Sequence, residues 1–237
     1  METLMKKSFI LLAVVLACTN LHAQTADEIV AKHVTAIGGK TAVDATKSLY
    51  IESSIEVMGN EGPSTTWIVN GKAAKSESEI GGTKIVQCIT DKGGWMINPF
   101  AGSTTPTAIP DEQLKPLKGQ INVGGPLYNY AAKGSKVELS GKDSADYKVK
   151  LTNADGIIVT FFINMKTWLI DKAISTNTVQ GQDIETTVTF SDYRKLDGGL
   201  VLNFGQQVST PMYTLNITHK KVEVNKDIDP TIFDMPK

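Results

Sequence analysis

The sequence predicts a mainly β protein whose strands follow one another as an antiparallel meander. Apolar and polar residues alternate with a period of two in about a dozen short runs from residue 49 onward. Turn sequences such as Asn70-Gly71 and Asp155-Gly156 separate these runs, and such short connections join antiparallel strands, because parallel strands need long crossovers. A sheet of this size curls readily, so we expect an open or incomplete barrel.

The first run is typical of a strand with one wet and one dry face: Leu49, Ile51, Ile55 and Val57 alternate with polar residues. The other predicted strands have the same pattern and the same punctuation by turns. They cover residues 65–70, 73–80, 83–90, 94–98, 136–141, 147–152, 157–164, 169–178, 183–193, 200–208 and 213–224.

Two helical regions accompany the strands. Residues 26–37 form a predicted amphipathic helix whose apolar stripe contains Ile29, Val30, His33, Val34 and Ile37. The acidic pair Asp27-Glu28 favours its N-terminus, Gly38-Gly39 ends it, and residues 40–47 form a further short helix.

Residues 108–132 are the one long interruption of the strand pattern, and Pro110 begins a helix there. This helical insert and the N-terminal helix can cover part of the dry face of the sheet. The uncovered remainder predicts an apolar cavity.

The first 23 residues are expected to be a signal peptide. Lys6-Lys7 precedes an apolar run of about ten residues, which is too short to span a bilayer. Cleavage after Ala23 would leave residues 24–237 as a single domain. The alternative is processing at Cys18 in Val15-Leu16-Ala17-Cys18, which would leave a lipidated outer-membrane protein.

The composition of residues 24–237 excludes several classes of partner. Without Lys6, Lys7 and Glu2 the chain keeps 22 basic and 24 acidic residues, a formal charge of −2. This balance gives no reason to expect nucleic acid, or an anionic membrane surface, as the main partner. We also expect a monomer. Cys88 has no second cysteine to pair with in residues 24–237, and its apolar neighbours predict a small buried side chain.

Motifs for catalysis or metal binding are missing from the sequence. His33 and His219 are the two histidines of residues 24–237, and neither belongs to a recognisable catalytic or zinc motif. Asn225-x-Asp227-x-Asp229 begins like a calcium loop, but Pro230 follows where that loop needs glycine. We therefore expect no enzyme activity, no cofactor and no metal; an exported hydrolase is a distant alternative.

Apolar residues that share strand phase are the candidate ligand-binding set, although core packing explains most such residues equally well. The segment from Trp95 to Phe100 leads into a glycine- and threonine-rich stretch that we expect to move as a lid. The full candidate set is Ile51, Ile55, Trp67, Trp95, Phe100, Val159, Phe161, Val188, Phe190, Leu202, Phe204 and Leu215.

Four segments together resemble a known family. They are residues 26–40 with Ile37-Gly38-Gly39-Lys40, residues 91–102 with Gly94-Trp95-Met96, residues 190–199 with Asp197-Gly198-Gly199, and residues 221–236 with Ile232-Phe233-Asp234. In this order, behind a signal peptide, they resemble outer-membrane lipoprotein-sorting proteins of the LolA/LolB type. The likeness extends over nearly all of residues 24–237.

The resemblance implies a curved antiparallel half-barrel closed by helices, which carries the acyl chains of a lipoprotein, or another envelope lipid, across the periplasm between inner- and outer-membrane sorting partners. It also implies a lid helix latched by an arginine. The only arginine here is Arg194, in a predicted strand end. The alternative function is a non-catalytic protein-interaction domain of an envelope assembly.

Overall fold

The computed structural model describes residues 24–179 and 182–236. The predicted signal peptide, Cys18 within it, and the turn at Gly181 lie outside the described residues. Cleavage after Ala23 and lipidation of Cys18 therefore both stay predictions.

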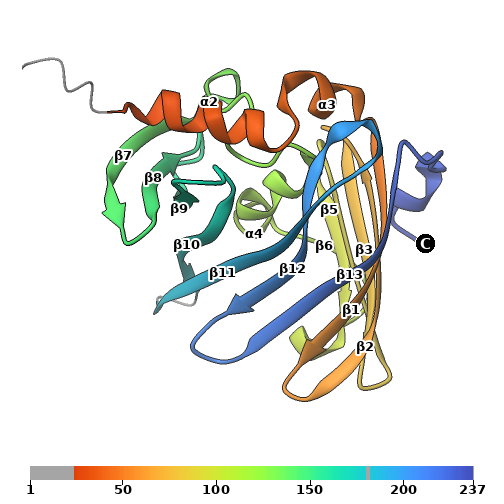
Figure 1. The fold of residues 1–237 in the computed structure, drawn as a ribbon. Helices are drawn as coiled ribbons and strands as arrows, with labels where there is room; N and C mark the ends of the chain where they lie inside the picture. Colours follow the sequence, from red (N-terminus) through yellow and green to blue (C-terminus); the bar gives the residue numbers. More distant parts are fainter. Residues whose placement is uncertain (1–23, 180–181, 237) are drawn as a thin grey trace, which may run out of the picture.

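Thirteen strands form one antiparallel sheet that curves into a half-barrel (Figure 1), in the order β6-β5-β4-β3-β2-β1-β13-β12-β11-β10-β9-β8-β7. The mainly β prediction is confirmed. The strands are β1 Ser48–Val57, β2 Asn60–Val69, β3 Ala73–Ile80, β4 Thr83–Thr90, β5 Gly94–Asn98, β6 Ser103–Ala108, β7 Lys136–Asp143, β8 Asp146–Thr152, β9 Ile158–Asn164, β10 Ile170–Val179, β11 Gln182–Lys195, β12 Val201–Ser209 and β13 Thr214–Val224.

The first and last strands pair with each other in the middle of the sheet, where Ile55 lies opposite Ile217. The two edge strands are consequently β6 and β7, the strands that flank the helical insert. The insert contains α4 Asp111–Leu114 and the 3₁₀ turns η2 Lys115–Ile121 and η3 Ala131–Lys133. It crosses from one edge of the sheet to the other, and α4 lies inside the curve (Figure 1).

Helices α2 Ala26–Ala36 and α3 Gly39–Ala45 lie across one end of the half-barrel (Figure 1). A capping box begins α2: the Thr25 hydroxyl accepts from the Glu28 amide, and the Glu28 carboxylate accepts from the Thr25 amide. The tight turn between the helices needs glycine at position 38, where φ is +112° and a Cβ would lie 2.4 Å from the Gly199 carbonyl oxygen. No helix in the described part of the chain is long and apolar enough to span a membrane.

The helices and the insert pack onto the concave face of the sheet and form its main core. Ile29 and Val30 of α2 pack with Phe161 and Ile163 of β9, and Val43 of α3 packs with residues of β1. Insert residues, among them Leu114, cover β3 and β4 in the same way. The end of the half-barrel nearest α2 and α3 is therefore filled by protein.

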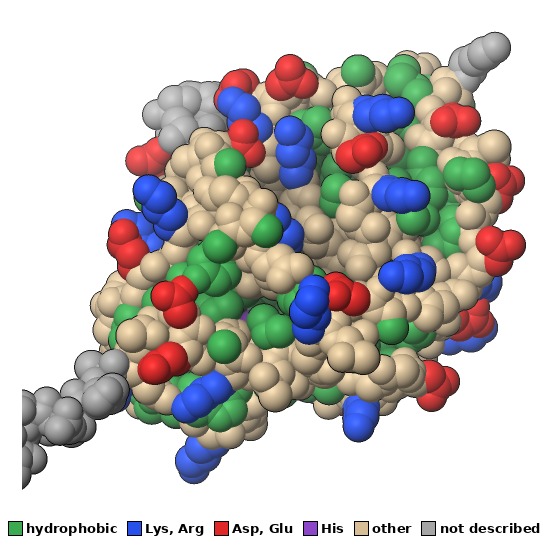
Figure 2. All heavy atoms as spheres, turned by 90° about the horizontal axis from the view of Figure 1, so that it is seen from above, with side chains coloured by type: hydrophobic (Ala, Val, Ile, Leu, Met, Phe, Trp, Pro, Cys, Tyr) green, Lys and Arg blue, Asp and Glu red, His purple; other side chains and the backbone are tan. Residues whose placement is uncertain are grey.

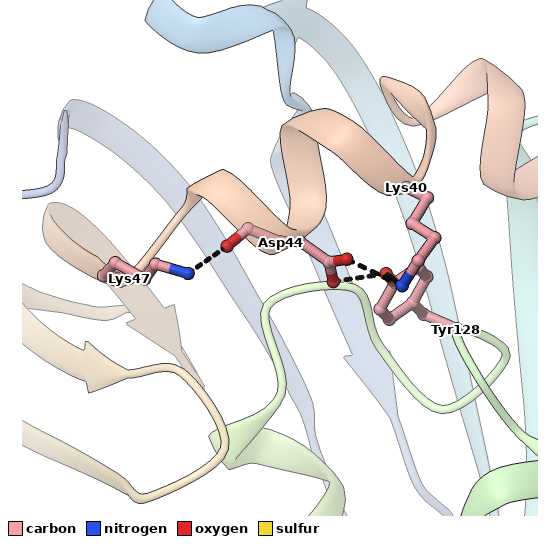
Figure 3. A network of polar contacts seen from close by, with 4 residues as sticks. All are labelled: Lys40, Asp44, Lys47 and Tyr128. Carbon is pink, nitrogen blue, oxygen red and sulfur yellow. Dashed lines mark hydrogen bonds and ion pairs between the residues drawn. The ribbon is translucent and has the colours of Figure 1, made fainter.

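Polar contacts also fix α3 to the insert (Figure 3). The Tyr128 hydroxyl donates to Asp44 Oδ1 at 2.5 Å, and Lys40 Nζ lies 2.7 Å from Asp44 Oδ2. Lys47 Nζ donates to the Asp44 carbonyl oxygen. The hydrogen bonds from Lys40 and Tyr128 lower the pKa of Asp44, so this network holds its carboxylate ionised.

A second hydrophobic cluster lies on the outer face of the sheet. The C-terminal 3₁₀ turn η5, Pro230–Phe233, covers β3 and β4 there, and Phe233 packs with Val86 and Cys88. Cys88 is fully buried, which confirms the sequence prediction, and desolvation raises its thiol pKa to about 11.

His33 lies beneath α2 with only 4% of its surface exposed, and its Nδ1 is 2.9 Å from the Trp168 carbonyl oxygen. Burial lowers its pKa below the ordinary value of 6.5, despite the opposing effect of that hydrogen bond. The neutral ring thus belongs to the core, as the apolar helix stripe predicts.

Lowering the pH should therefore destabilise the fold through His33. Because the unfolded chain binds a proton more readily than the folded one, the free energy of unfolding should fall as the pH drops below about 6.5. His33→Gln, which retains an amide donor, should show a smaller fall than the parent between about pH 7.5 and about pH 5.5. Urea titrations at several pH values measure this, and identical pH dependence in both proteins would contradict it.

Candidate functional site

The register of the strands assigns each side chain to a face. Leu49 and Ile51 pack with Ile37 and Val43 of the helical layer, so the odd-numbered positions of β1 lie on the concave face. Their direct partners in β13, which include Ile217 opposite Ile55, lie on the same face.

Most of the candidate set shares this concave face. Val188 pairs with Val208, and Val208 pairs with Leu215, which joins β11, β12 and β13 to β1. Val159 and Phe161 belong to the cluster beneath α2. The predicted residues on the concave face are Ile51, Ile55, Val159, Phe161, Val188, Phe190, Leu202, Phe204 and Leu215.

Trp67 and Trp95, also members of the candidate set, lie on the outer face of the sheet instead. Trp67 pairs with Tyr50 and Lys75, which lie on the outer face, and the two rings of Trp67 and Tyr50 meet edge to face. Trp95 lies beneath the C-terminal segment, where its Nε1 donates to the Phe233 carbonyl oxygen at 2.9 Å. Because that segment covers the outer face of β2 to β5, both faces of these strands carry apolar residues, and periodicity cannot tell them apart.

The predicted lid is also wrong in part. Residues 103–108, expected to be mobile, form edge strand β6, which pairs with β5. Phe100 lies in the turn between these strands and is 68% exposed. It therefore stands at a hairpin tip, and a contact between Phe100 and a ligand stays a prediction.

Part of the concave face remains outside the helical core. Ile51, Leu202 and Phe161 pack with residues of the helices. The ends of β1, β11, β12 and β13 that lie away from α2 and α3 carry side chains that belong to none of the clusters formed with the helices or the insert in the described chain. We call this surface the distal concave face. It consists of Ile55, Val57, Val188, Gln206, Val208, Leu215 and Ile217.

Polar side chains separate the helical core from the distal concave face. Ser53 Oγ lies 2.8 Å from His219 Nδ1, and the Ser64 and Ser78 hydroxyls are also 2.8 Å apart. Burial lowers the pKa of His219. Strand phase places Ser53 between Ile51 and Ile55, but no motif in the sequence marks this group as functional.

The Ser53–His219 pair does not form a Ser-His-Asp arrangement. Its imidazole Nε2 has no hydrogen-bond partner among the described residues, so no carboxylate orients the ring for proton transfer. In the segment that begins like a calcium loop, Asp229 accepts from the Thr231 amide at the start of η5. Among the described residues no group of three metal-ligating side chains is present.

Exposed apolar side chains occur on several turns at the rim of the half-barrel that lies farthest from α2 and α3. Because neighbouring strands run in opposite directions, the turns after β1, β5 and β12 all lie at this rim (Figure 1). Met58 and Met212 are 79% and 71% exposed there, and Phe100 and Tyr213 are exposed as well. We call Met58, Phe100, Met212 and Tyr213 the rim residues.

The opposite end of the molecule has a different character. Viewed from the side of α2 and α3, Lys and Arg side chains are mixed with Asp and Glu side chains across the surface (Figure 2).

A separate cavity of about 200 Å³ lies between the insert and the β8–β9 hairpin, lined by Pro116, Leu151, Val159 and three lysines among others. The predicted site residue Val159 therefore borders this cavity.

Known structures share this fold. A LolA superfamily protein from Nitrosomonas europaea matches with a TM-score of 0.58 and 13% identity, over 90% of this chain and 98% of that one. A DUF1329 family protein from Desulfovibrio piger gives 0.57 and 14%, over 88% and 95%. A proposed outer membrane lipoprotein-sorting protein domain from Vibrio parahaemolyticus gives 0.55 and 10%, over 88% and 95%.

The chain thus has the fold of LolA superfamily proteins, which confirms the predicted resemblance at the level of the fold. No protein-family model matches the sequence, and no curated protein matches it.

Phe233→Ala tests how much the hydrophobic cluster on the outer face contributes to stability. Phe233→Ala removes a buried ring from the outer face and should lower the free energy of unfolding by about 3 kcal/mol. Phe100→Ala, at an exposed tip, should change it by less than about 0.5 kcal/mol. Denaturant titrations of both variants measure the difference, and equal effects would show that the C-terminal segment contributes little to stability.

Proposed function

We propose that this protein is a non-catalytic carrier that holds the acyl chains of lipoproteins, or of another envelope lipid, on its concave face. The observation that carries this proposal is the distal concave face, where apolar side chains of four adjacent strands remain outside the helical core. Hydrocarbon would gain about 0.8 kcal/mol for each methylene that it buries against such a surface.

The route to this face would be the rim. Lipid must leave a membrane or another protein before it reaches the sheet, and the rim residues present apolar side chains at the end of the half-barrel that α2 and α3 do not cover. These side chains are exposed on three hairpin turns, where they would be available for contact with a source of acyl chains.

The comparisons support the same proposal through the fold alone. One of the structures is named for outer membrane lipoprotein sorting, and we extend that role to this chain as a hypothesis. The signal-peptide pattern of residues 1–23 fits export to the periplasm, where such a carrier would act.

The alternative is a protein-interaction domain, and the rim residues also favour it. Methionine side chains adapt to varied surfaces, and Met58 and Met212 are both highly exposed. In that case the distal concave face would hold no lipid, and purification from the native envelope would yield a protein partner.

A charge on the distal concave face should abolish lipid binding. Leu215→Asp places a carboxylate that hydrocarbon would have to desolvate, so the affinity for a fluorescent fatty acid should fall at least about tenfold. Thr214→Asp adds the same charge to the same strand, at an exposed neighbouring position, and should bind as the parent does. Fluorescence titration measures both; parent-like binding by Leu215→Asp would refute the proposal.

Phe100→Asp tests the rim. Because Phe100 is exposed, the substitution should change the free energy of unfolding by less than about 0.5 kcal/mol. Acyl binding should weaken, since the new charge must be desolvated where hydrocarbon enters. Thermal unfolding and fatty-acid titration together check this, and unchanged binding would make the β5–β6 turn a simple connection. Phe161→Asp should instead unfold the protein, because Phe161 lies in the core.

A further inference from the structure

The concave face carries two open hydrogen-bond donors on either side of Phe204. The His219 ring meets the Phe204 ring edge to face, with centroids 6.1 Å apart. The Arg194 guanidinium carbon lies 4.3 Å from the Phe204 centroid. Arg194 is opposite Leu202 in the β11–β12 register, so it shares the concave face with Phe204.

The free nitrogen of His219 follows from its bond to Ser53. Ser53 is buried, and His219 is the only hydrogen-bond partner of its side chain among the described residues. Either atom of this pair could be the donor. We assign the hydrogen bond to the Ser53 hydroxyl as donor and Nδ1 as acceptor, because this arrangement uses the hydroxyl hydrogen; the proton of the neutral ring then lies on Nε2. Nε2 has no hydrogen-bond partner in the described chain. The two unpartnered side-chain atoms that are buried there belong to Asn98 and Asp146, so the Nε2 atom of His219 is accessible.

Arg194 has unused donors as well. Its Nε and Nη2 donate to the two carboxylate oxygens of Asp192, at 3.0 and 2.5 Å. Nη1 makes no hydrogen bond within the described chain, and about half of the side chain is exposed. Two donors therefore flank one aromatic ring at the inner boundary of the distal concave face.

We propose that this group, His219, Phe204 and Arg194, binds the carbonyl end of an acyl chain, as a carboxylate or an ester, while the chain runs along the distal concave face toward the rim. The inference rests on the proposed carrier function and specifies its ligand. From His219 to Leu215 the strand advances about 13 Å, which gives the hydrocarbon an apolar path of that length.

The chemistry of the surroundings favours an acceptor-rich head group. His219 and Arg194 offer N–H donors on this side, and the nearby Asp192 carboxylate already accepts two hydrogen bonds from Arg194. An alkylammonium head would bring further donors to a place where donors are already in excess. A carboxylate or an ester offers acceptors to these nitrogens and brings no donor of its own in competition with them. Phe204 then packs against the first carbons of the chain.

Competition between ligands of equal chain length tests this inference. The delipidated protein is loaded with N-phenylnaphthylamine, a neutral apolar fluorophore, which is displaced with dodecanoic acid, methyl dodecanoate or dodecylamine. We expect the acid, the ester or both to bind about tenfold tighter than the amine, the size expected for one or two donated hydrogen bonds. Preference for the acid alone indicates a carboxylate, and preference for both indicates an ester.

Three variants assign the effect to residues. His219→Phe keeps a ring against Phe204 but removes the donor, and it should abolish the preference over the amine while the fluorophore still binds. Arg194→Gln alters an exposed side chain, so it tests the same preference should His219→Phe fail to fold. Ser64→Ala is the matched control, because its hydroxyl is bonded to Ser78, and it should retain the preference.

The two proposals fail in different ways. Equal displacement by acid, ester and amine, or a preference that survives in both His219→Phe and Arg194→Gln, would overturn the head-group inference and leave the carrier function standing. Absence of fluorophore binding by the parent protein would overturn both.

Discussion

The pairing of the first strand with the last determines the rest of this architecture. Because β1 and β13 lie side by side in the centre of the sheet, the two strands that flank the insert become its edges. The insert must then connect one edge to the other, and it does so inside the curve, where its apolar residues complete the core. One constraint of topology thus produces an open half-barrel whose concavity is partly filled by its own chain.

Strand periodicity and turn sequences were sufficient to predict twelve of the thirteen strands, but not the edge strand β6. The helical spacing of apolar residues predicted α2, and the break in the strand pattern at Pro110 predicted the insert. Strand periodicity was also sufficient for most of the concave residues, since Ile51, Ile55 and Phe204 follow a simple alternation. Periodicity failed at Trp67 and Trp95, because a segment more than a hundred residues away covers the outer face of their strands. A pattern within one strand contains no information about such a distant contact.

The polar group on the concave face shows a different limit of prediction from sequence patterns. Sequence patterns place the small residues Ser53, Ser64 and Ser78 in strands but give no sign of a polar site. His219 has no recognisable motif around it. Only the register brings Ser53 opposite His219. The result is a face that is apolar at both ends and hydrogen-bonding in the middle, which suits an amphiphile better than a uniform hydrocarbon.

Several polar contacts attach the two N-terminal helices to the rest of the fold. α2 is held by the His33–Trp168 contact and by a hydrogen bond from the Tyr130 hydroxyl to Asp27. The carbonyl oxygen of Ile37, the C-cap residue of α2, accepts from the Val201 amide at 2.9 Å. α3 has its own network through Asp44 and Tyr128. The arginine latch that the family resemblance implies has no counterpart in the helices of the described chain: the single arginine, Arg194, lies on β11 over Phe204. Under the proposed function, a ligand would reach the distal concave face from the rim.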